Sequence, residues 1–251
     1  LLCKNETGYK NLIKLVSAGF LEGFYSKPRI DHDLLEQYHE GLICLSACLA
    51  GEVPQALLNG EYERACRIAR SYEALFGKGN YYIELQDHGL DEDRVVLPQL
   101  IRLSRETGIP MAATNDAHYL TREDAKMQSI LLCIQTGKTI ADADRMEFQT
   151  EEFYVKSADE MYELFSMVPE ACENTSRIAE QCNFSFTFGQ TKLPYFQAPD
   201  GLDNEAYFEK LCREGLARRY PGKVTPELQK RLEYEVNVIR TMGYTNYYLI
   251  V

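Results

Sequence analysis

The segment TNDAHYL, residues 114–120, places two metal-binding residue types two positions apart. Asp116 and His118 follow an apolar run that ends at Ala113. In an extended segment, side chains at positions i and i+2 point to the same side, so both could reach one cation. Aspartate and histidine are ligands for Zn, Mn and Fe. The spacing leaves three interpretations open: a metal site, a general acid–base pair, or a polar loop that closes a strand.

Other candidate residues occur in or after two earlier apolar runs. Cys48 follows the first run in LSACLAGE, and His88 follows the second in ELQDHG. Cys48 is also consistent with a small buried apolar residue, and His88 with a turn residue that points to solvent. Glu84 lies inside the second run, and the pattern does not decide which face of the strand it occupies. If the runs are neighbouring strands, their polar ends share one edge.

Short apolar runs alternate with amphipathic segments in the first half of the chain. The periodicity predicts strands at 41–46, 81–85 and 109–113, and helices at 7–18, 61–76 and 91–107. This alternation is typical of parallel βα units, whose right-handed crossovers bring the carboxyl ends of all strands to one edge. Functional residues gather at that edge in α/β proteins. The fold class is therefore predicted to be α/β.

The second half of the chain has a different pattern. Residues 148–156 are expected to form an exposed strand or loop. Ser157 followed by Glu160 predicts a helix that begins with a capping box. Further helices are predicted at 169–182, 204–220 and 226–242. The aromatic, proline-bearing stretch 184–199 lacks a clean period, which predicts a boundary, and we divide the chain into 1–185 and 186–251.

Composition excludes several classes of protein. The chain is 45% apolar and 26% charged, which is ordinary for a soluble globular protein, and its formal charge of −11 opposes non-specific binding of nucleic acid. No apolar run is long enough to span a membrane. The eight cysteines are scattered without a CxxC pair, which predicts free thiols in a reducing cytoplasm. Phosphate-binding glycine loops and a nucleophile elbow are absent.

Five segments carry a resemblance to a known family. They are LLCKNETGYKNL, GLICLSACLAGEVPQALLNG, YYIELQDHGL, IPMAATNDAHYL and RLEYEVNVIRTMGYTNYYLIV. In this order they resemble the alpha subunits of bacterial DNA polymerase III, the family-C replicative DNA polymerases. The resemblance implies a cytoplasmic enzyme that performs DNA-directed nucleotidyl transfer with Mg in its palm domain. It also implies DNA, deoxynucleotides and other replicase subunits as partners, and no membrane.

The resemblance also implies a domain arrangement and a site. Residues 1–185 would be a PHP (polymerase and histidinol phosphatase) domain, a distorted βα barrel without its N-terminal strands. Residues 186–251 would be a mostly helical connector and the N-terminal part of the palm. Cys48, Asp116 and His118 match ligand positions of a divalent-metal cluster of Zn, Mn or Fe, and His88 and Glu84 would lie beside it. Such a site resembles a 3′–5′ exonuclease or phosphoesterase centre.

The sequence departs from the family pattern at both ends. The N-terminal H-x-H motif is absent, a further ligand histidine is expected just before Leu1, and the palm aspartates are expected beyond Val251. We therefore expect an incomplete metal site, no catalytic residue for polymerisation in this chain, and self-association through apolar edges of the barrel. Two alternatives stay open: a non-catalytic PHP scaffold that braces the polymerase core, and a PHP-family metallophosphatase. MGYTNYYLIV disfavours the second.

Overall fold

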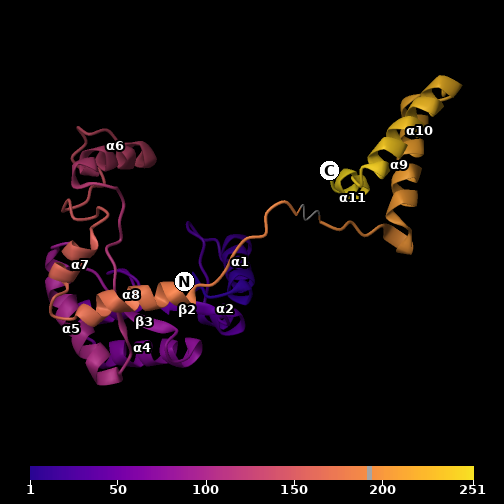
Figure 1. Cartoon of the computed structure of the whole chain (residues 1–251). Helices are drawn as coiled ribbons and strands as arrows, with labels where there is room; N and C mark the ends of the chain where they lie inside the picture. The colour runs from indigo at the N-terminus through magenta and orange to yellow at the C-terminus, as the bar shows by residue number, and fades with distance from the viewer. Residues whose placement is uncertain (191–193) are drawn as a thin grey trace. The chain divides into compact units, whose positions relative to one another are not determined.

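The computed structural model describes residues 1–190 and 194–251, which form two compact units, Leu1–Ser185 and Phe186–Val251 (Figure 1). The first unit is mixed α/β, as predicted, and the second is helical in its described part. Residues 191–193 of the predicted boundary stretch lie outside the described residues. Among the described residues, no helix is both long and apolar enough to cross a membrane.

The first unit is built on a four-stranded sheet with the order β1-β2-β3-β4. The strands are β1 (Leu2–Cys3), β2 (Leu42–Leu45), β3 (Tyr81–Leu85) and β4 (Met111–Ala113). β2, β3 and β4 run parallel, as the sequence predicts, whereas β1 is antiparallel to β2. The described strands form one small sheet, so the predicted barrel is not confirmed in this part of the chain.

Helices connect and cover the strands of this unit. They are α1 (Glu6–Leu21), α2 (His32–Tyr38), α3 (Glu52–Leu58), α4 (Tyr62–Phe76), α5 (Asp91–Thr107), α6 (Ala125–Thr136), α7 (Ala158–Leu164) and α8 (Pro169–Gln181), with a 3₁₀ turn η1 (Arg122–Asp124) before α6. α8 packs against β4, and its Asn174 donates from Nδ2 to the carbonyl oxygen of Met111 at 2.7 Å. This bond satisfies a backbone acceptor on the last strand of the sheet.

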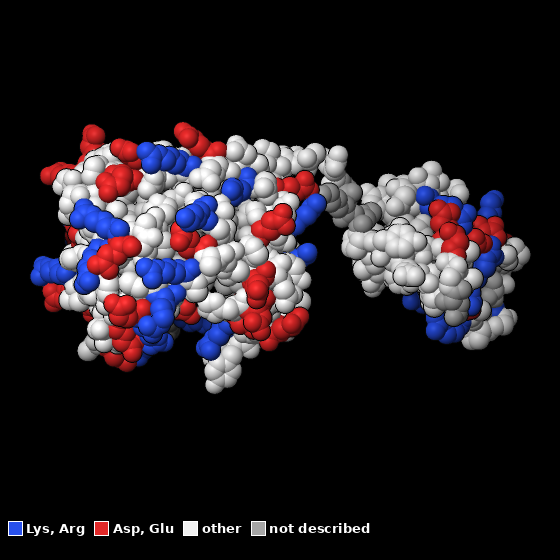
Figure 2. Space-filling view, turned by 90° about the horizontal axis from the view of Figure 1, so that it is seen from below, with Lys and Arg blue, Asp and Glu red and all other residues white. Residues whose placement is uncertain are grey.

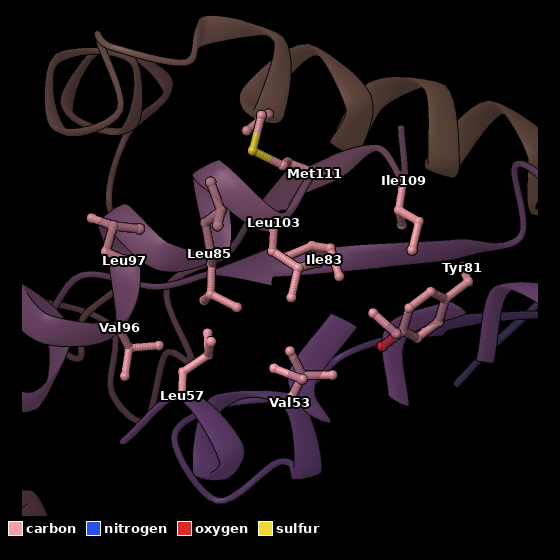
Figure 3. Packing of buried hydrophobic residues seen from close by; sticks show 14 of the residues in the cluster. Val53, Leu57, Tyr81, Ile83, Leu85, Val96, Leu97, Leu103, Ile109 and Met111 are labelled. Carbon is pink, nitrogen blue, oxygen red and sulfur yellow. The ribbon is translucent and has the colours of Figure 1, made fainter. Parts of the chain in front are cut away.

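The hydrophobic core lies mainly between the sheet and helices α3 and α5. Alternate residues of β3 point to opposite faces, as a strand requires. Ile83 and Leu85 meet Val53 of α3 and Val96 of α5 on one face (Figure 3). Tyr82 points to the other face, in a smaller cluster that includes a residue of α8. Both faces of the sheet are therefore buried, which fits the nearly continuous apolar sequence of β3.

The second unit consists of α9 (Asn204–Arg219), α10 (Pro226–Thr241) and α11 (Thr245–Ile250), preceded by the 3₁₀ turn η2 (Pro199–Gly201). α9 contacts both other helices. Asn204, the first residue of α9, donates from Nδ2 to Oδ1 of Asn246 at 2.7 Å, and Arg240 of α10 pairs with Glu205 and Glu209 of α9. Polar contacts thus join the helices of this unit.

Replacing Ile83 by Ala tests whether β3 is the centre of the core. Ile83 is fully buried, so the substitution leaves a cavity and is expected to lower the free energy of unfolding by about 2–5 kcal/mol. The measurement is urea unfolding followed by circular dichroism. Val95→Ala on the exposed side of α5 is the matched control, expected to change stability by less than about 0.5 kcal/mol. Equal effects of the two substitutions would contradict this packing.

Candidate metal-binding site

The segment TNDAHYL follows β4 at the carboxyl end of the parallel strands. Nε2 of His118 lies 3.5 Å from Oδ2 of Asp116, and the two side chains are 38% and 44% exposed. The two residues therefore meet, as the sequence predicts, and both side chains are partly exposed. An imidazole nitrogen and a carboxylate oxygen at this separation can either interact with each other or bind one transition-metal ion.

Two strand ends at this edge turn through an unusual backbone conformation. Asp116 after β4 has φ of 42°, and Ala47 after β2 has φ of 66°. The left-handed region costs an L-residue roughly 1–2 kcal/mol, although aspartate tolerates it better than most. Such conformations persist only where the surroundings hold them, and they cluster at functional sites. Two of the three described non-glycine residues with a positive φ thus lie at the edge that carries the candidate residues, and the third, Ser26, lies elsewhere.

A later segment of the chain packs on TNDAHYL. The backbone N–H of His118 donates to the carbonyl oxygen of Phe153 at 2.7 Å, and that of Val155 donates to Tyr119 at 3.2 Å. The imidazole of His118 also lies against the Phe153 ring, with centroids 5.9 Å apart. Residues 148–156 were predicted to be exposed, but Phe153 and Tyr154 are buried. The prediction was wrong for these two because they pair with a segment more than thirty residues away.

Cys48 and Glu84 lie at the ends of the neighbouring strands. Cys48 is half-buried after β2, and it lines a small pocket together with Glu84, Gln86 and Asp93. Oε1 of Glu84 accepts hydrogen bonds from Oγ1 of Thr114 at 2.6 Å and from Nε2 of Gln86 at 3.3 Å. Glu84 thus reaches the residue that begins TNDAHYL.

His88 is a buried residue, and the alternative in which it points to solvent is wrong. It is 3% exposed, and its ring stacks on that of Phe153 at a centroid distance of 4.0 Å. Its Nε2 lies 2.9 Å from the carbonyl oxygen of Asn115. Because a carbonyl can only accept, Nε2 must carry the proton that it donates. A nitrogen engaged in this way is not available to a metal ion.

The described residues do not assemble a complete metal cluster. Within the part of the chain that the structure covers, no three His, Cys, Asp or Glu side chains lie close enough together to hold an ion. Asp116 and His118 meet each other, and Cys48 and Glu84 share a pocket, but the two groups do not form one donor set. The donor types fit a transition metal, whereas three or four protein ligands are usual for zinc. The fit is therefore partial.

A charged network lies beside the site, and most of it has no signal in the sequence. The guanidinium of Arg122 pairs with the carboxylate of Glu152, and it also contacts Tyr154. The hydroxyl of Tyr154 donates to Oε1 of Glu160 at 2.6 Å. The predicted capping box is confirmed, since Ser157 and Glu160 exchange backbone-to-side-chain bonds. The sequence pattern indicated the capping box, but it did not indicate the hydrogen bond from Tyr154 to Glu160.

Two parts of the chain match family models of known proteins. Residues 1–88 match the model of the PHP domain, and residues 206–251 match that of the bacterial DNA polymerase III alpha NTPase domain. The two matches fall in the first and second unit respectively.

Over its full length the chain is similar to DNA polymerase III alpha subunits, as the sequence resemblance predicts. It is 48% identical to the subunit of Treponema pallidum and 47% identical to that of Borreliella burgdorferi, with 100% of this chain and 22% of each relative covered. It is 38% identical to the subunit of Thermus aquaticus, with 97% of this chain and 20% of the relative covered. The chain thus spans about a fifth of the length of these relatives.

The Glu160 carboxylate gives this region a predictable pH dependence. Hydrogen bonds lower the pKa of Glu160 to about 2. The bond from the Tyr154 hydroxyl has the largest effect, and the bonds from the backbone and side chain of Ser157 come next. Because the pKa is lower in the folded state, Glu160 contributes stability above the unfolded value of about 4.3, and this is lost as pH falls toward 2. A carboxyl NMR titration should therefore give Glu160 a midpoint near 2.

Two variants provide the contrast for this titration. Tyr154→Phe removes the strongest hydrogen bond to Glu160, so its pKa is expected to rise toward the ordinary value. Tyr162→Phe, on α7 itself, is the matched control and should leave the midpoint unchanged. A Glu160 midpoint above 4 in the unaltered chain would contradict the network.

Proposed function

We propose that the chain is a segment of the catalytic alpha subunit of a bacterial replicative DNA polymerase, which performs DNA-directed nucleotidyl transfer in the cytoplasm. The observation that supports this most strongly is the similarity over the whole chain to alpha subunits of several bacteria. In this proposal the palm residues that bind Mg and transfer nucleotides belong to the rest of the subunit. The chain itself supplies no catalytic residue for polymerisation.

Each unit has a proposed place in that subunit. Residues 1–185 would be part of a PHP domain, a distorted βα barrel to which β2, β3 and β4 contribute parallel strands. Residues 186–251 would be the connector and the N-terminal part of the palm. The position of the two family matches and the helical character of the second unit support this division.

The proposed site of the PHP part is a divalent-metal centre for Zn, Mn or Fe. Asp116 and His118 would be two of its ligands, because their donor atoms already meet and their side chains are partly exposed. Cys48 would be a third ligand from the end of β2, while Glu84 and His88 would lie beside the site. A bound metal would activate water and stabilise charge on phosphoryl oxygens, the chemistry of a phosphoesterase or 3′–5′ exonuclease.

The surface charge bears on the proposed DNA partner. Acidic and basic side chains are interspersed over the face of residues 1–185 that Figure 2 shows. Together with the formal charge of −11, this disfavours a broad phosphate-binding surface on that face. DNA, deoxynucleotides and the other replicase subunits are therefore proposed as partners of the whole subunit, with most of the DNA contacts elsewhere.

Self-association is a second proposed property of this chain. The side chains of Val16, Phe20 and Leu21 on α1, and of Phe24 after it, are more than half exposed. Contiguous exposed apolar residues of this kind favour association with another surface. Sedimentation should therefore show concentration-dependent oligomers, and a monomer at every concentration would contradict the proposal.

A metal titration tests the proposed site. Co²⁺ is expected to bind the chain weakly, because the described donor set is incomplete, and to give an absorption spectrum in the visible range. Asp116→Asn and His118→Ala are each expected to weaken binding by at least about tenfold, since each removes a ligand. His32→Ala, a histidine on α2, is the matched control.

The same variants in a full-length alpha subunit separate the rival functions. A catalytic PHP site predicts that His118→Ala lowers metal-dependent 3′–5′ exonuclease activity while polymerisation continues. A bracing scaffold predicts no change in exonuclease activity and a loss of stability. A PHP-family metallophosphatase predicts phosphomonoester hydrolysis by this chain. Unchanged Co²⁺ binding in both ligand variants would rule out the proposed centre.

A further inference from the structure

Asn115, the residue directly before Asp116, engages both polar atoms of its side chain in hydrogen bonds. Its Nδ2 donates to the carbonyl oxygen of Glu152 at 2.9 Å and to that of Tyr154 at 2.7 Å. Its Oδ1 accepts from Nζ of Lys156 at 3.1 Å. An amide has two donors on one end and an acceptor on the other, so these partners fix its orientation. The side chain is held by the segment that packs on TNDAHYL.

Lys156 is a buried ammonium that completes this arrangement. Its side chain is 6% exposed, and Nζ lies 2.5 Å from the carbonyl oxygen of Glu152 and 3.2 Å from the Glu152 carboxylate. With the bond to Asn115, the ammonium has two hydrogen-bond acceptors and one paired carboxylate around it. The ring of Tyr154 lies 4.5 Å from Nζ. A charge buried this deeply is retained only where its partners compensate the loss of water.

His88 holds the backbone of Asn115 from another element. Its Nε2 donates to the Asn115 carbonyl oxygen, which belongs to the peptide that enters Asp116. The backbone N–H of His88 donates to Oδ2 of Asp93 at 2.9 Å, and its ring stacks on Phe153. The donor is therefore itself fixed in place. Asn115 is thus held at its backbone by one segment and at its side chain by another.

We infer that Asn115, Lys156 and His88 are positioning residues that hold Asp116 in its left-handed conformation, with its carboxylate facing His118. The φ of Asp116 is 42°, which costs free energy unless the flanking chain is fixed. Rotation of Asp116 out of the left-handed region would change the course of the chain between Asp116 and His118, and with it the position of the carboxylate relative to the imidazole. The inference about the conformation of Asp116 is independent of the proposed function, while its consequence for metal binding rests on the proposed function.

Two substitutions in the full chain test the inference. Lys156→Met keeps the length of the side chain and removes the donors, and Asn115→Leu keeps the shape of the amide and removes its polar atoms. Lys78→Met is the matched control. Lys78 is exposed in the loop before β3, at the amino end of that strand, whereas TNDAHYL lies at the carboxyl end of the parallel strands. The readouts are the backbone coupling constants and the intraresidue H^N–Hα NOE of Asp116, which report its φ by NMR.

Amide hydrogen exchange gives a second readout of the same contacts. In Lys156→Met and Asn115→Leu, exchange at His118 and Val155 is expected to accelerate by at least about tenfold, because both amides donate hydrogen bonds that join TNDAHYL to the segment that is released. Exchange at Ile83, in the core of the sheet, should stay unchanged, which separates local release from general destabilisation. A positive φ at Asp116 and unchanged exchange in both variants would overturn the inference.

Co²⁺ affinity separates failure of this inference from failure of the proposed metal site. If both hold, Lys156→Met weakens Co²⁺ binding by roughly 10–100-fold, the usual effect of losing a residue that orients a ligand. If Asp116 changes conformation but Asp116→Asn has no effect on Co²⁺ binding, the positioning role stands and the metal site falls. If Asp116→Asn weakens binding while Lys156→Met leaves both φ and affinity unchanged, the metal site stands and the positioning role falls.

Discussion

The parallel pairing of β3 with β4 is the constraint on which the candidate site depends. The register pairs Ile83 with Met111 and Leu85 with Ala113, so the two strands end level with each other. The backbone N–H of Thr114 then donates to the carbonyl oxygen of Leu85 at 2.9 Å, which ties the start of TNDAHYL to the end of β3. A shift of one residue would turn every side chain of β4 to the other face. The buried core on both faces of the sheet prevents this shift.

Beyond the strand ends, order comes from polar contacts rather than from apolar packing. The loop after β4 is held by the side chain of Asn115, by the backbone of Phe153 and by Nε2 of His88. Polar groups taken out of water are costly unless they find partners, and here the amide of Asn115 and the ammonium of Lys156 both have them. In our account these polar contacts hold the loop in one conformation. Asp116 and His118 can then be partly exposed while the backbone that carries them is held in place.

Periodicity predicted the elements that depend on local pattern. β3 and α5 have the predicted bounds, because alternating or helical spacing of apolar residues reports burial directly. β1, with two residues, is too short to show a period, and its pairing depends on a distant strand. α6 was not predicted; most of its apolar side chains are exposed, so its sequence lacks a clear amphipathic stripe.

The site was predictable only in part, for a related reason. The D-x-H spacing brought Asp116 and His118 to attention, because two neighbours in sequence are also neighbours in space. Lys156 lies 41 positions after Asn115, and nothing in either local sequence indicates that their side chains meet. His88 could be placed at the correct edge, but its burial depends on Phe153, far along the chain. Contacts of this kind are set by the tertiary fold.

The nitrogen resonances of the histidine rings test the central claim most directly, namely that Asp116 and His118 form a metal-binding pair on a rigid edge. In a two-dimensional NMR spectrum of the ¹⁵N-labelled chain, each of the four histidines gives its own pair of ring signals. On addition of Zn²⁺, one ring nitrogen of His118 should shift to the metal-bound position while His88 keeps its protonated Nε2. A shift at His32 or His39 with none at His118, or displacement of the His88 proton by the metal, would contradict the account.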